Sequence, residues 1–125
     1  MIQAKSKTPH FSTELSTQTH TILSDVPSDK GGSDAGMRPH ELLEAALASC
    51  MQITIQMGAA KYGFSPGSTY CEVTLDRSVP EKTTFVYKLH LDPDLTQEQV
   101  EHMRRFASKC PVRKTLSAEI GFKEA

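Results

Sequence analysis

The feature that most constrains the fold is one long helical segment, which begins with PHELLEAALASCMQ at Pro39 and extends to about Tyr62. Proline suits the first turn of a helix, and Gly63 follows as a typical end signal. At 100° per residue the segment has an apolar stripe and a mostly polar opposite side, which Ala48 and Ile55 interrupt. We therefore predict a largely buried central helix, with a sheet against one face and a partner subunit against another. The predicted stripe consists of Leu43, Ala46, Leu47, Cys50, Ile53 and Met57.

Short segments with β-branched residues and partly alternating polarity surround this helix. Three of them precede it and predict a meander, and two follow it as a hairpin joined by the turn SVPEK. A second helix is expected after Asp92, where Thr96 and Gln99 have the spacing of a capping box, and a short strand is expected to close the chain. The predicted strands cover residues 2–7, 11–17, 19–25, 68–78, 83–91 and 118–123.

The resulting order, β-β-β-α-β-β-α-β, predicts an α+β fold. A chain of 125 residues has the length of one ordinary domain, so we expect a single domain over residues 1–125. Residues 27–39 gather Gly, Pro, Ser and Asp into a connecting loop that lacks the Gly-Lys-Ser/Thr signature of a phosphate-binding loop. With 6% aromatic residues and no Trp, the chain has few large side chains to fill a core, which favours completion of the core by dimerisation.

The charge balance excludes some classes of partner. Fourteen Lys and Arg against 15 Asp and Glu leave a net charge of −1, so we expect no binding to nucleic acid or to an anionic membrane. The N-terminal residues lack the apolar core of a signal peptide, and no run of about 18 apolar residues occurs. A cytoplasmic location is therefore expected.

The three cysteines, Cys50, Cys71 and Cys110, are too few and too widely spaced for a secreted disulfide scaffold. No CxxC or His-Cys cluster indicates a zinc site. Cys71 lies on the apolar face of a predicted strand and is interpreted as core. Cys50 allows the same interpretation, because a free cysteine on an apolar helical stripe is usually a small packing residue.

Cys110 differs because it directly precedes Pro111, which ends the second helix and can open a new turn. Cys110 would then be an N-cap residue, where free backbone N–H groups lower the pKa of a thiol. Lys109, Arg113 and Lys114 would act in the same direction. Alternatively, these cations are simply solvated side chains of a surface turn. If Cys110 and Cys50 converge when the helices pack, they form a reactive thiol and a resolving thiol, the arrangement used for reversible oxidation.

Two motifs resemble those of one family. PHELLEAALASCMQ resembles the P-x-E-L-L-x-A-A-x-x-x-C helix of the OsmC/Ohr family of thiol peroxidases, and KCPVRKTLS is similar to the second-cysteine motif of that family, commonly C-P-V-H-K/R-T-L. The motifs occur in the order found in the family, and the resemblance covers essentially the whole chain. It implies an OsmC-like fold and an intertwined homodimer with two active sites at its interface.

The resemblance also implies a chemistry. Cys50 would attack organic hydroperoxides, Cys110 would resolve the product as a disulfide, and an external dithiol such as dihydrolipoamide would reduce it. No metal or bound cofactor is implied.

The chain departs from the active members of this family at the residues that activate the thiolate. Those members have a glutamate ten residues before the first cysteine and an arginine in the N-terminal strands. Here His40 occupies the glutamate position, Glu41 follows one place later, and no arginine precedes Arg38. Ten residues of helix span about 15 Å, so any contact of His40 or Glu41 with Cys50 must be bridged or must come from the partner subunit. We expect Glu41 and Arg38 to complete the catalytic site, with Arg113 as a second candidate cation; the alternative for Arg38 is a solvated cation of the loop. Since burial raises the pKa of a thiol, Cys50 is expected to be reactive only if Arg38, Arg113, His40 or the partner subunit supplies positive charge.

The sequence therefore predicts a cysteine-based hydroperoxide reductase. The alternative is a non-enzymatic, small-molecule-binding dimer of the same fold that has lost the activating Arg/Glu pair. Sulfur transfer through a persulfide on Cys50 would use the same thiols and stays open at this stage.

Overall fold

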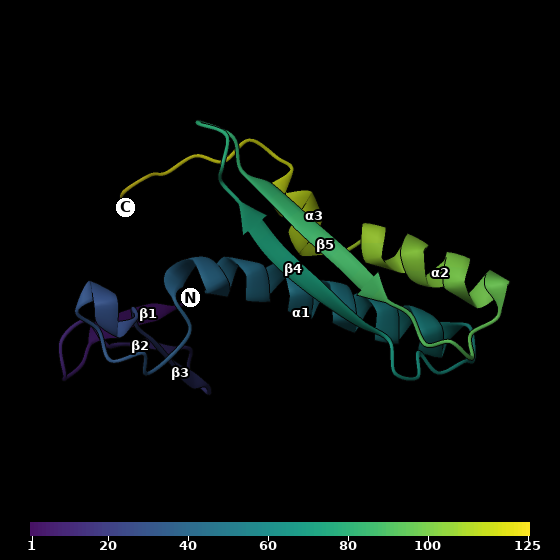
Figure 1. Ribbon diagram of the computed structural model, residues 1–125, viewed down its shortest axis with the longest axis horizontal. Coiled ribbons are helices and arrows are strands. Elements are labelled where there is room, and N and C mark those ends of the chain that lie inside the picture. Colours follow the sequence, from purple (N-terminus) through teal and green to yellow (C-terminus); the bar gives the residue numbers. More distant parts are fainter. The chain divides into compact units, whose positions relative to one another are not determined.

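A computed structural model describes all 125 residues and shows the predicted α+β architecture (Figure 1). Two compact units are present, residues 1–43 and 44–125, and the long helix begins in the first and continues through the second. The expectation of a single domain over residues 1–125 stays a prediction. The elements are β1 (Gln3–Ser6), β2 (Thr13–Ser16), β3 (Thr21–Ser24), η1 (Ser28–Lys30), α1 (Pro39–Lys61), β4 (Tyr70–Asp76), β5 (Thr84–His90), α2 (Gln97–Ser108) and α3 (Pro111–Leu116).

The first unit contains the predicted meander, in which β1 pairs antiparallel with β2 and β2 with β3. The loop that follows is organised by the buried carboxylate of Asp25. This carboxylate accepts hydrogen bonds from the backbone N–H groups of Val26, Ser33 and Ala35 and from the Ser33 hydroxyl. These bonds, first of all that from Val26, lower the pKa of Asp25 to about 2. The glycine-rich loop is therefore a folded connection built around one charge.

Helix α1 begins and ends where its sequence signals predict. The carboxylate of Glu41 accepts a hydrogen bond of 2.8 Å from the backbone N–H of Arg38, which precedes the first helical residue. At the other end Gly63 adopts a φ of 76°, the left-handed conformation that terminates a helix. The local signals thus fix the length of the helix.

The predicted buried face of α1 is wrong. The core face consists of Leu47, Met51, Ile55 and Ala59, spaced four residues apart. Of the predicted stripe only Leu47 belongs to it, whereas Ile53 and Met57 are 54% and 68% exposed. Both sides of this helix are apolar, so periodicity alone did not identify the side that packs against the rest of its own chain.

The hairpin β4–β5 lies over α1 with the predicted alternation. Cys71, Val73 and Leu75 face the helix, and the residues between them face outward. Two polar contacts fix the hairpin on the helix: the Glu44 carboxylate accepts a 2.7 Å hydrogen bond from the Leu75 N–H, and the Cys71 thiol donates to the Ala48 carbonyl at 3.3 Å. The register pairs Cys71 with Leu89 and Leu75 with Phe85.

Helix α2 opens with the predicted capping box of Thr96 and Gln99, in which both reciprocal bonds are present. It packs against the C-terminal half of α1, where the rings of Tyr62 and Phe106 lie 5.7 Å apart. A Cβ atom at Gly58 would lie 2.5 Å from Cγ of Phe106, so the close approach of the two helices requires glycine there. The α2 side of the core consists of Met103 and Ala107, followed by Cys110.

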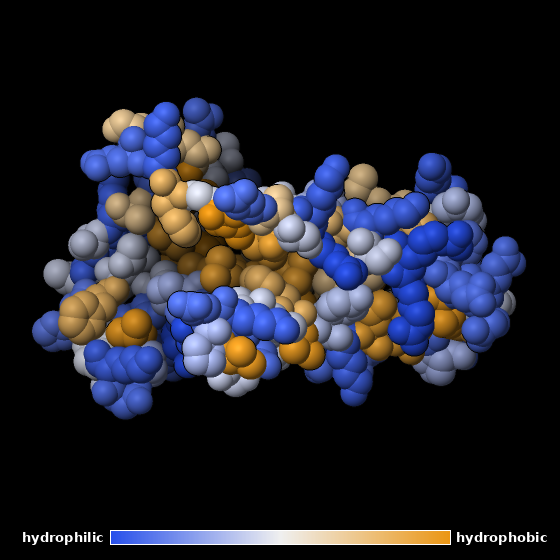
Figure 2. Space-filling view, turned by 90° about the horizontal axis from the view of Figure 1, so that it is seen from above, coloured by the Kyte–Doolittle hydropathy of each residue, from blue (hydrophilic) through white to orange (hydrophobic).

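The strand predicted at residues 118–123 is absent. The chain instead forms α3 after Cys110 and then continues without regular structure, with Ile120 and Phe122 56% and 98% exposed. A strand needs a neighbour to complete its hydrogen bonds. Strands β4 and β5 pair only with each other, so this tail finds no partner strand within the chain. Figure 2 shows a face on which hydrophobic side chains lie uncovered between charged ones.

Candidate functional site: two thiols at the start of α3

Cys50 lies half-buried near the middle of α1 and packs against the core cluster. It occupies the border between the buried face of the helix and the exposed apolar face that carries Ile53 and Met57. Its sulfur therefore belongs neither to the fully enclosed core nor to open solvent.

Cys110 is the N-cap residue of α3, as predicted, and is only 1% exposed. Pro111 occupies the first helical position, where the lack of an N–H costs nothing because that group would have no partner within the helix. The first N–H groups available at this helix start are therefore those of Val112 and Arg113. The local sequence thus places a buried thiol beside free backbone donors.

The structure brings Cys50 and Cys110 together through a hydrogen bond between their side chains. Burial raises the pKa of Cys50, but hydrogen bonds from the Cys110 thiol, the Val112 N–H and the Thr54 hydroxyl more than offset it and lower the pKa overall. Cys50 is consequently the thiol that ionises more readily than usual.

Cys110 is shifted in the opposite direction. Burial raises its pKa, the hydrogen bond to Cys50 raises it further, and the nearby N–H of Arg113 only partly opposes this. Its side chain makes no geometrically well-formed capping bond. The expectation of a lowered pKa at Cys110 is therefore wrong, because burial and the interaction with Cys50 outweigh the N–H groups of Arg113 and Val112 at the start of α3.

Thr54 and Val112 are the contributors that the sequence interpretation missed. Thr54 lies one helical turn after Cys50, and its hydroxyl donates to the Cys50 carbonyl at 2.7 Å. A hydroxyl has one hydrogen, so it serves either this carbonyl or the sulfur at any moment. The i to i+4 spacing pointed to Thr54, whereas the role of Val112 depends on how α3 packs against α1.

Arg38 and Glu41 lie together at the start of α1. Nη2 of Arg38 is 2.7 Å from Oε1 of Glu41, and the arginine, through its side chain first and then its backbone N–H, lowers the pKa of Glu41. Along one helix Glu41 and Cys50 are nine residues apart, which corresponds to about 14 Å. The structure therefore joins the two residues to each other and leaves their predicted role at Cys50 a proposal.

Arg113 bonds to β5 instead of to either thiol. Its Nη1 donates to the Tyr87 hydroxyl at 3.3 Å, and its guanidinium carbon lies 5.5 Å from the centre of that ring.

The third cysteine, Cys71, has a pKa raised by burial, as expected of a packing residue. No group of three or more His, Cys, Asp or Glu side chains is arranged to hold a metal ion, and no helix is long and apolar enough to cross a membrane.

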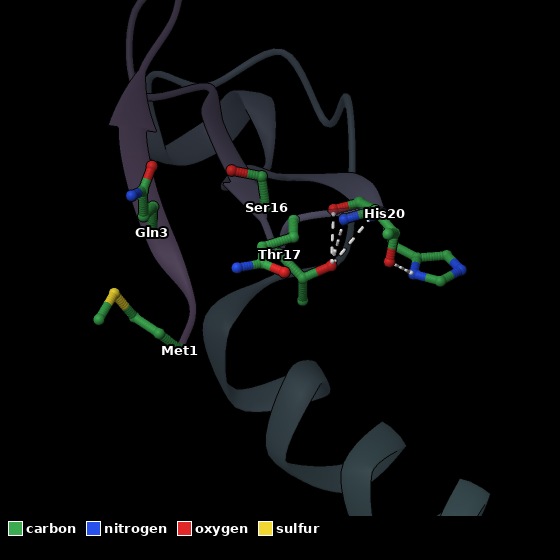
Figure 3. Close-up of a pocket in the computed structure, with 7 residues that line it drawn as sticks. Met1, Gln3, Ser16, Thr17 and His20 are labelled. Atoms are coloured by element: carbon green, nitrogen blue, oxygen red, sulfur yellow. Dashed lines mark hydrogen bonds between the residues drawn. The ribbon is translucent and has the colours of Figure 1, made fainter.

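Two cavities adjoin this site. One, of about 240 Å³, lies between α1, β5 and α3 and combines apolar side chains with one cation; its lining includes Leu47, Phe85, Tyr87, Arg113 and Leu116 but neither thiol. The other, of about 440 Å³, is a groove at the junction of α2 and α3; its lining is Ser108, Lys109, Cys110, Arg113, Lys114 and Ser117. A further pocket of about 670 Å³ lies in the first unit, between the N-terminal residues and the turn at Thr17–His20 (Figure 3), and has no cysteine in its lining.

Fold and site together define a small α+β protein with a hydrogen-bonded pair of thiols of divergent acidity. The family model for the OsmC-like protein matches residues 31–124. The chain therefore belongs to the OsmC-like protein family, as its motifs predicted. No curated protein sequence matches it.

Solved structures share the fold. A protein from Psychrobacter arcticus 273-4, named for osmotic stress induction and detoxification, is 23% identical, with a TM-score of 0.75 over 91% of this chain and 85% of that one. An OsmC-like protein from Mycoplasma pneumoniae is 19% identical, with a TM-score of 0.71 over 93% and 85%. The organic hydroperoxide resistance protein OhrB of Bacillus subtilis is 16% identical, with a TM-score of 0.63 over 94% and 89%. The α+β fold expected from the resemblance is thereby confirmed.

Proposed function

We propose that the protein is a thiol peroxidase that reduces organic hydroperoxides, with Cys50 as the attacking thiol and Cys110 as the resolving thiol. The observation that carries the proposal is the set of hydrogen bonds that lowers the pKa of Cys50 despite its burial. A peroxidatic cysteine must react as a thiolate, and three neutral donors provide for that here. The names of structural neighbours, among them organic hydroperoxide resistance proteins from Legionella pneumophila and Bacillus subtilis, support a peroxide-related role.

The proposed reaction proceeds in two steps within the protein. The Cys50 thiolate attacks the terminal oxygen of the hydroperoxide, the O–O bond breaks, and the alkoxide takes a proton and leaves as an alcohol. Cys50 is then a sulfenic acid. The sulfur of Cys110 attacks the Cys50 sulfur, and the hydroxide that leaves takes the Cys110 proton to become water. An external dithiol reduces the resulting Cys50–Cys110 disulfide.

The cavity of about 240 Å³ beside α1 suits a lipophilic hydroperoxide. Leu47, one turn before Cys50, lies in its wall with Phe85 and Leu116. Apolar walls bind the carbon chain of a substrate, while the hydroperoxide group needs a polar environment of the kind that Cys50 has.

We also propose that a second copy of the chain covers the exposed face of α1. Leu43, Ala46, Cys50, Ile53 and Met57 follow one another in steps of three and four residues, the spacing of helix-to-helix contact, and the largest of them are exposed. In such a homodimer Arg38 and Glu41 would act on the Cys50 of the other subunit, since they are too far along the helix to act on their own.

Peroxide consumption tests the proposed reaction. Stopped-flow measurements with cumene hydroperoxide and a dithiol should show turnover for the wild type and none for Cys50→Ser. Cys110→Ser should consume about one equivalent and retain a sulfenic acid at Cys50, detectable with a dimedone-type reagent. Cys71→Ser is the matched control and should behave like the wild type. Equal consumption by all four proteins would overturn the proposal.

The dimer has its own test. Ile53→Glu should yield monomers by sedimentation velocity, because a charge cannot be buried against a second helix without a partner. Gln56→Glu introduces the same charge on an exposed position outside the stripe and should remain dimeric. A monomeric wild type, or a dimer that tolerates Ile53→Glu, would contradict this part of the proposal.

One observation favours the alternative of a non-enzymatic binding dimer: the groups that lower the pKa of Cys50 include no cation. A mild peroxide pulse followed by mass spectrometry separates the two functions. A Cys50–Cys110 disulfide supports redox catalysis, and two free thiols support binding without chemistry.

A further inference from the structure

The groove at the junction of α2 and α3 has a chemical character that the peroxide reaction does not use. Three of its six lining residues are cationic, Lys109, Arg113 and Lys114, and none is acidic. No carboxylate lies within 4.0 Å of any of these three cations; the ion pairs of the molecule lie elsewhere. Glu119 lines an adjoining hollow with Lys114 without forming an ion pair. A groove with this lining attracts an anion.

The groove also gives access to one particular sulfur-bearing residue. Cys110 belongs to its lining and Cys50 does not. Cys110 is buried in the reduced protein, and α3, which it caps, is a helix of six residues, none of them fully buried, that packs on the core through Val112 and Leu116. The reductant would reach the sulfur by a local displacement of this short helix, with α1 and α2 left in place.

Thiol exchange chemistry gives an independent argument for the same sulfur. When a thiolate attacks a disulfide, the sulfur with the lower pKa leaves faster. The pKa of Cys50 is lowered and that of Cys110 is raised. Attack on Cys110 therefore expels the better leaving group, whereas attack on Cys50 expels the worse one.

We propose that this groove binds the dithiol reductant, that it favours a dithiol bearing a negative charge, and that the dithiol attacks Sγ of Cys110 while Cys50 leaves. The inference rests on the disulfide and the dithiol of the proposed function and adds the binding groove, the charge preference and the sulfur that is attacked. The first thiolate of the dithiol bonds to Cys110, the Cys50–Cys110 bond breaks, and Cys50 departs as a thiolate. The second thiol attacks the first sulfur of its own molecule and releases Cys110, which takes a proton. The dithiol is oxidised by two electrons to a cyclic disulfide.

Dihydrolipoate and dihydrolipoamide test the charge preference, because they share one dithiol and differ by one negative charge. The disulfide form is prepared with diamide, so that the test does not depend on peroxidase activity. The rate of each dithiol with the protein disulfide is divided by the rate of the same dithiol with hydroxyethyl disulfide. At low salt we expect the normalised rate of dihydrolipoate to be about three- to tenfold higher than that of dihydrolipoamide. Added salt should reduce this preference. Equal normalised rates would overturn the charge preference.

Matched variants assign the preference to the groove. Lys109→Gln with Lys114→Gln should abolish most of it, while Lys61→Gln with Lys88→Gln removes the same charge from exposed positions outside the groove and should preserve it. An equal loss in both double variants would show an effect of net charge and would contradict the groove assignment.

Peptide mapping identifies the attacked sulfur. The diamide-oxidised protein is treated with mercaptopropionate, an anionic monothiol that cannot complete the second step, and the adduct is located in the tryptic fragments that separate Cys50 from Cys110. The adduct is expected on Cys110, and an adduct on Cys50 would refute the route. A disulfide that forms with diamide but not with peroxide would remove the proposed function and leave this inference standing. Failure to form it with either oxidant would remove both.

Discussion

A hydrogen bond between the side chains of Cys110 and Cys50 shifts the pKa values of the two thiols in opposite directions, lowering that of Cys50 and raising that of Cys110. Burial raises both, but Cys50 also receives a hydrogen bond from the Val112 N–H and shares the Thr54 hydroxyl with its own carbonyl, whereas Cys110 faces the developing charge of its neighbour. Two chemically identical side chains thus differ in acidity.

Removing this donor should weaken Cys50 as a nucleophile. In Cys110→Ala the pKa of Cys50 is expected to rise, because burial then acts against fewer hydrogen bonds. Cys110→Ser keeps a donor and should retain a pKa closer to the wild type. The pH dependence of iodoacetamide alkylation, located at Cys50 by mass spectrometry, measures this. An unchanged alkylation profile in Cys110→Ala would contradict the assignment.

The Thr54 hydroxyl should support the thiolate as well. Thr54→Val keeps the shape of the side chain and removes its hydrogen, so the pKa of Cys50 should rise, by less than in Cys110→Ala since Thr54 is the weakest of the three donors. Thr54→Ser restores the donor and should restore the pKa. The same alkylation profile checks the order of the variants, and a Thr54→Val profile identical to that of the wild type would show that the hydroxyl serves only the Cys50 carbonyl.

Asp25 should make the first unit sensitive to acid. Its pKa is lowered from 3.8 to about 2, chiefly by the N–H of Val26, so its carboxylate contributes stability that is complete above pH 3.8 and is lost as the pH falls towards 2. Amide hydrogen exchange at Ser33 and Ala35 should accelerate over this range. Asp25→Asn should abolish the dependence, while Asp29→Asn, an exposed position in η1, should leave it intact. Constant protection down to pH 2 would exclude this role.

Gly58 tests the contact between α1 and α2. Alanine normally stabilises a helix interior relative to glycine by about 1 kcal/mol, but here its Cβ would lie 2.5 Å from the Phe106 ring. We expect Gly58→Ala to be destabilising by about 1–3 kcal/mol in urea unfolding. Gly58→Ala in the background of Phe106→Leu should recover part of this loss. A stabilised single variant would show that the helices separate freely.

The parts of the fold that local signals determine could be predicted from the sequence. Pro39 and Gly63 mark the ends of α1, Thr96 and Gln99 cap α2, and Pro111 makes Cys110 an N-cap. In each case the signal lies within a few residues of the structure that it forms.

The parts that depend on partners could not be predicted. Helix α1 is apolar on two sides, and the choice of Met51 and Ile55 over Ile53 and Met57 for the core is made by β4 and α2. The tail around Ile120 alternates like a strand but has no neighbour to pair with. The divergent acidity of the thiols requires α3 to pack beside α1, which no spacing of residues along the chain reveals.

The two thiols that meet here are 60 positions apart in the chain. A cystine between them would close a loop of that length and restrict the unfolded chain, which is worth about 4 kcal/mol by the chain-entropy relation. For a protein of this size that corresponds to a rise in melting temperature on the order of 10 °C. The melting temperature would then distinguish the oxidised form from the reduced form, so a thermal scan would show which form a sample contains.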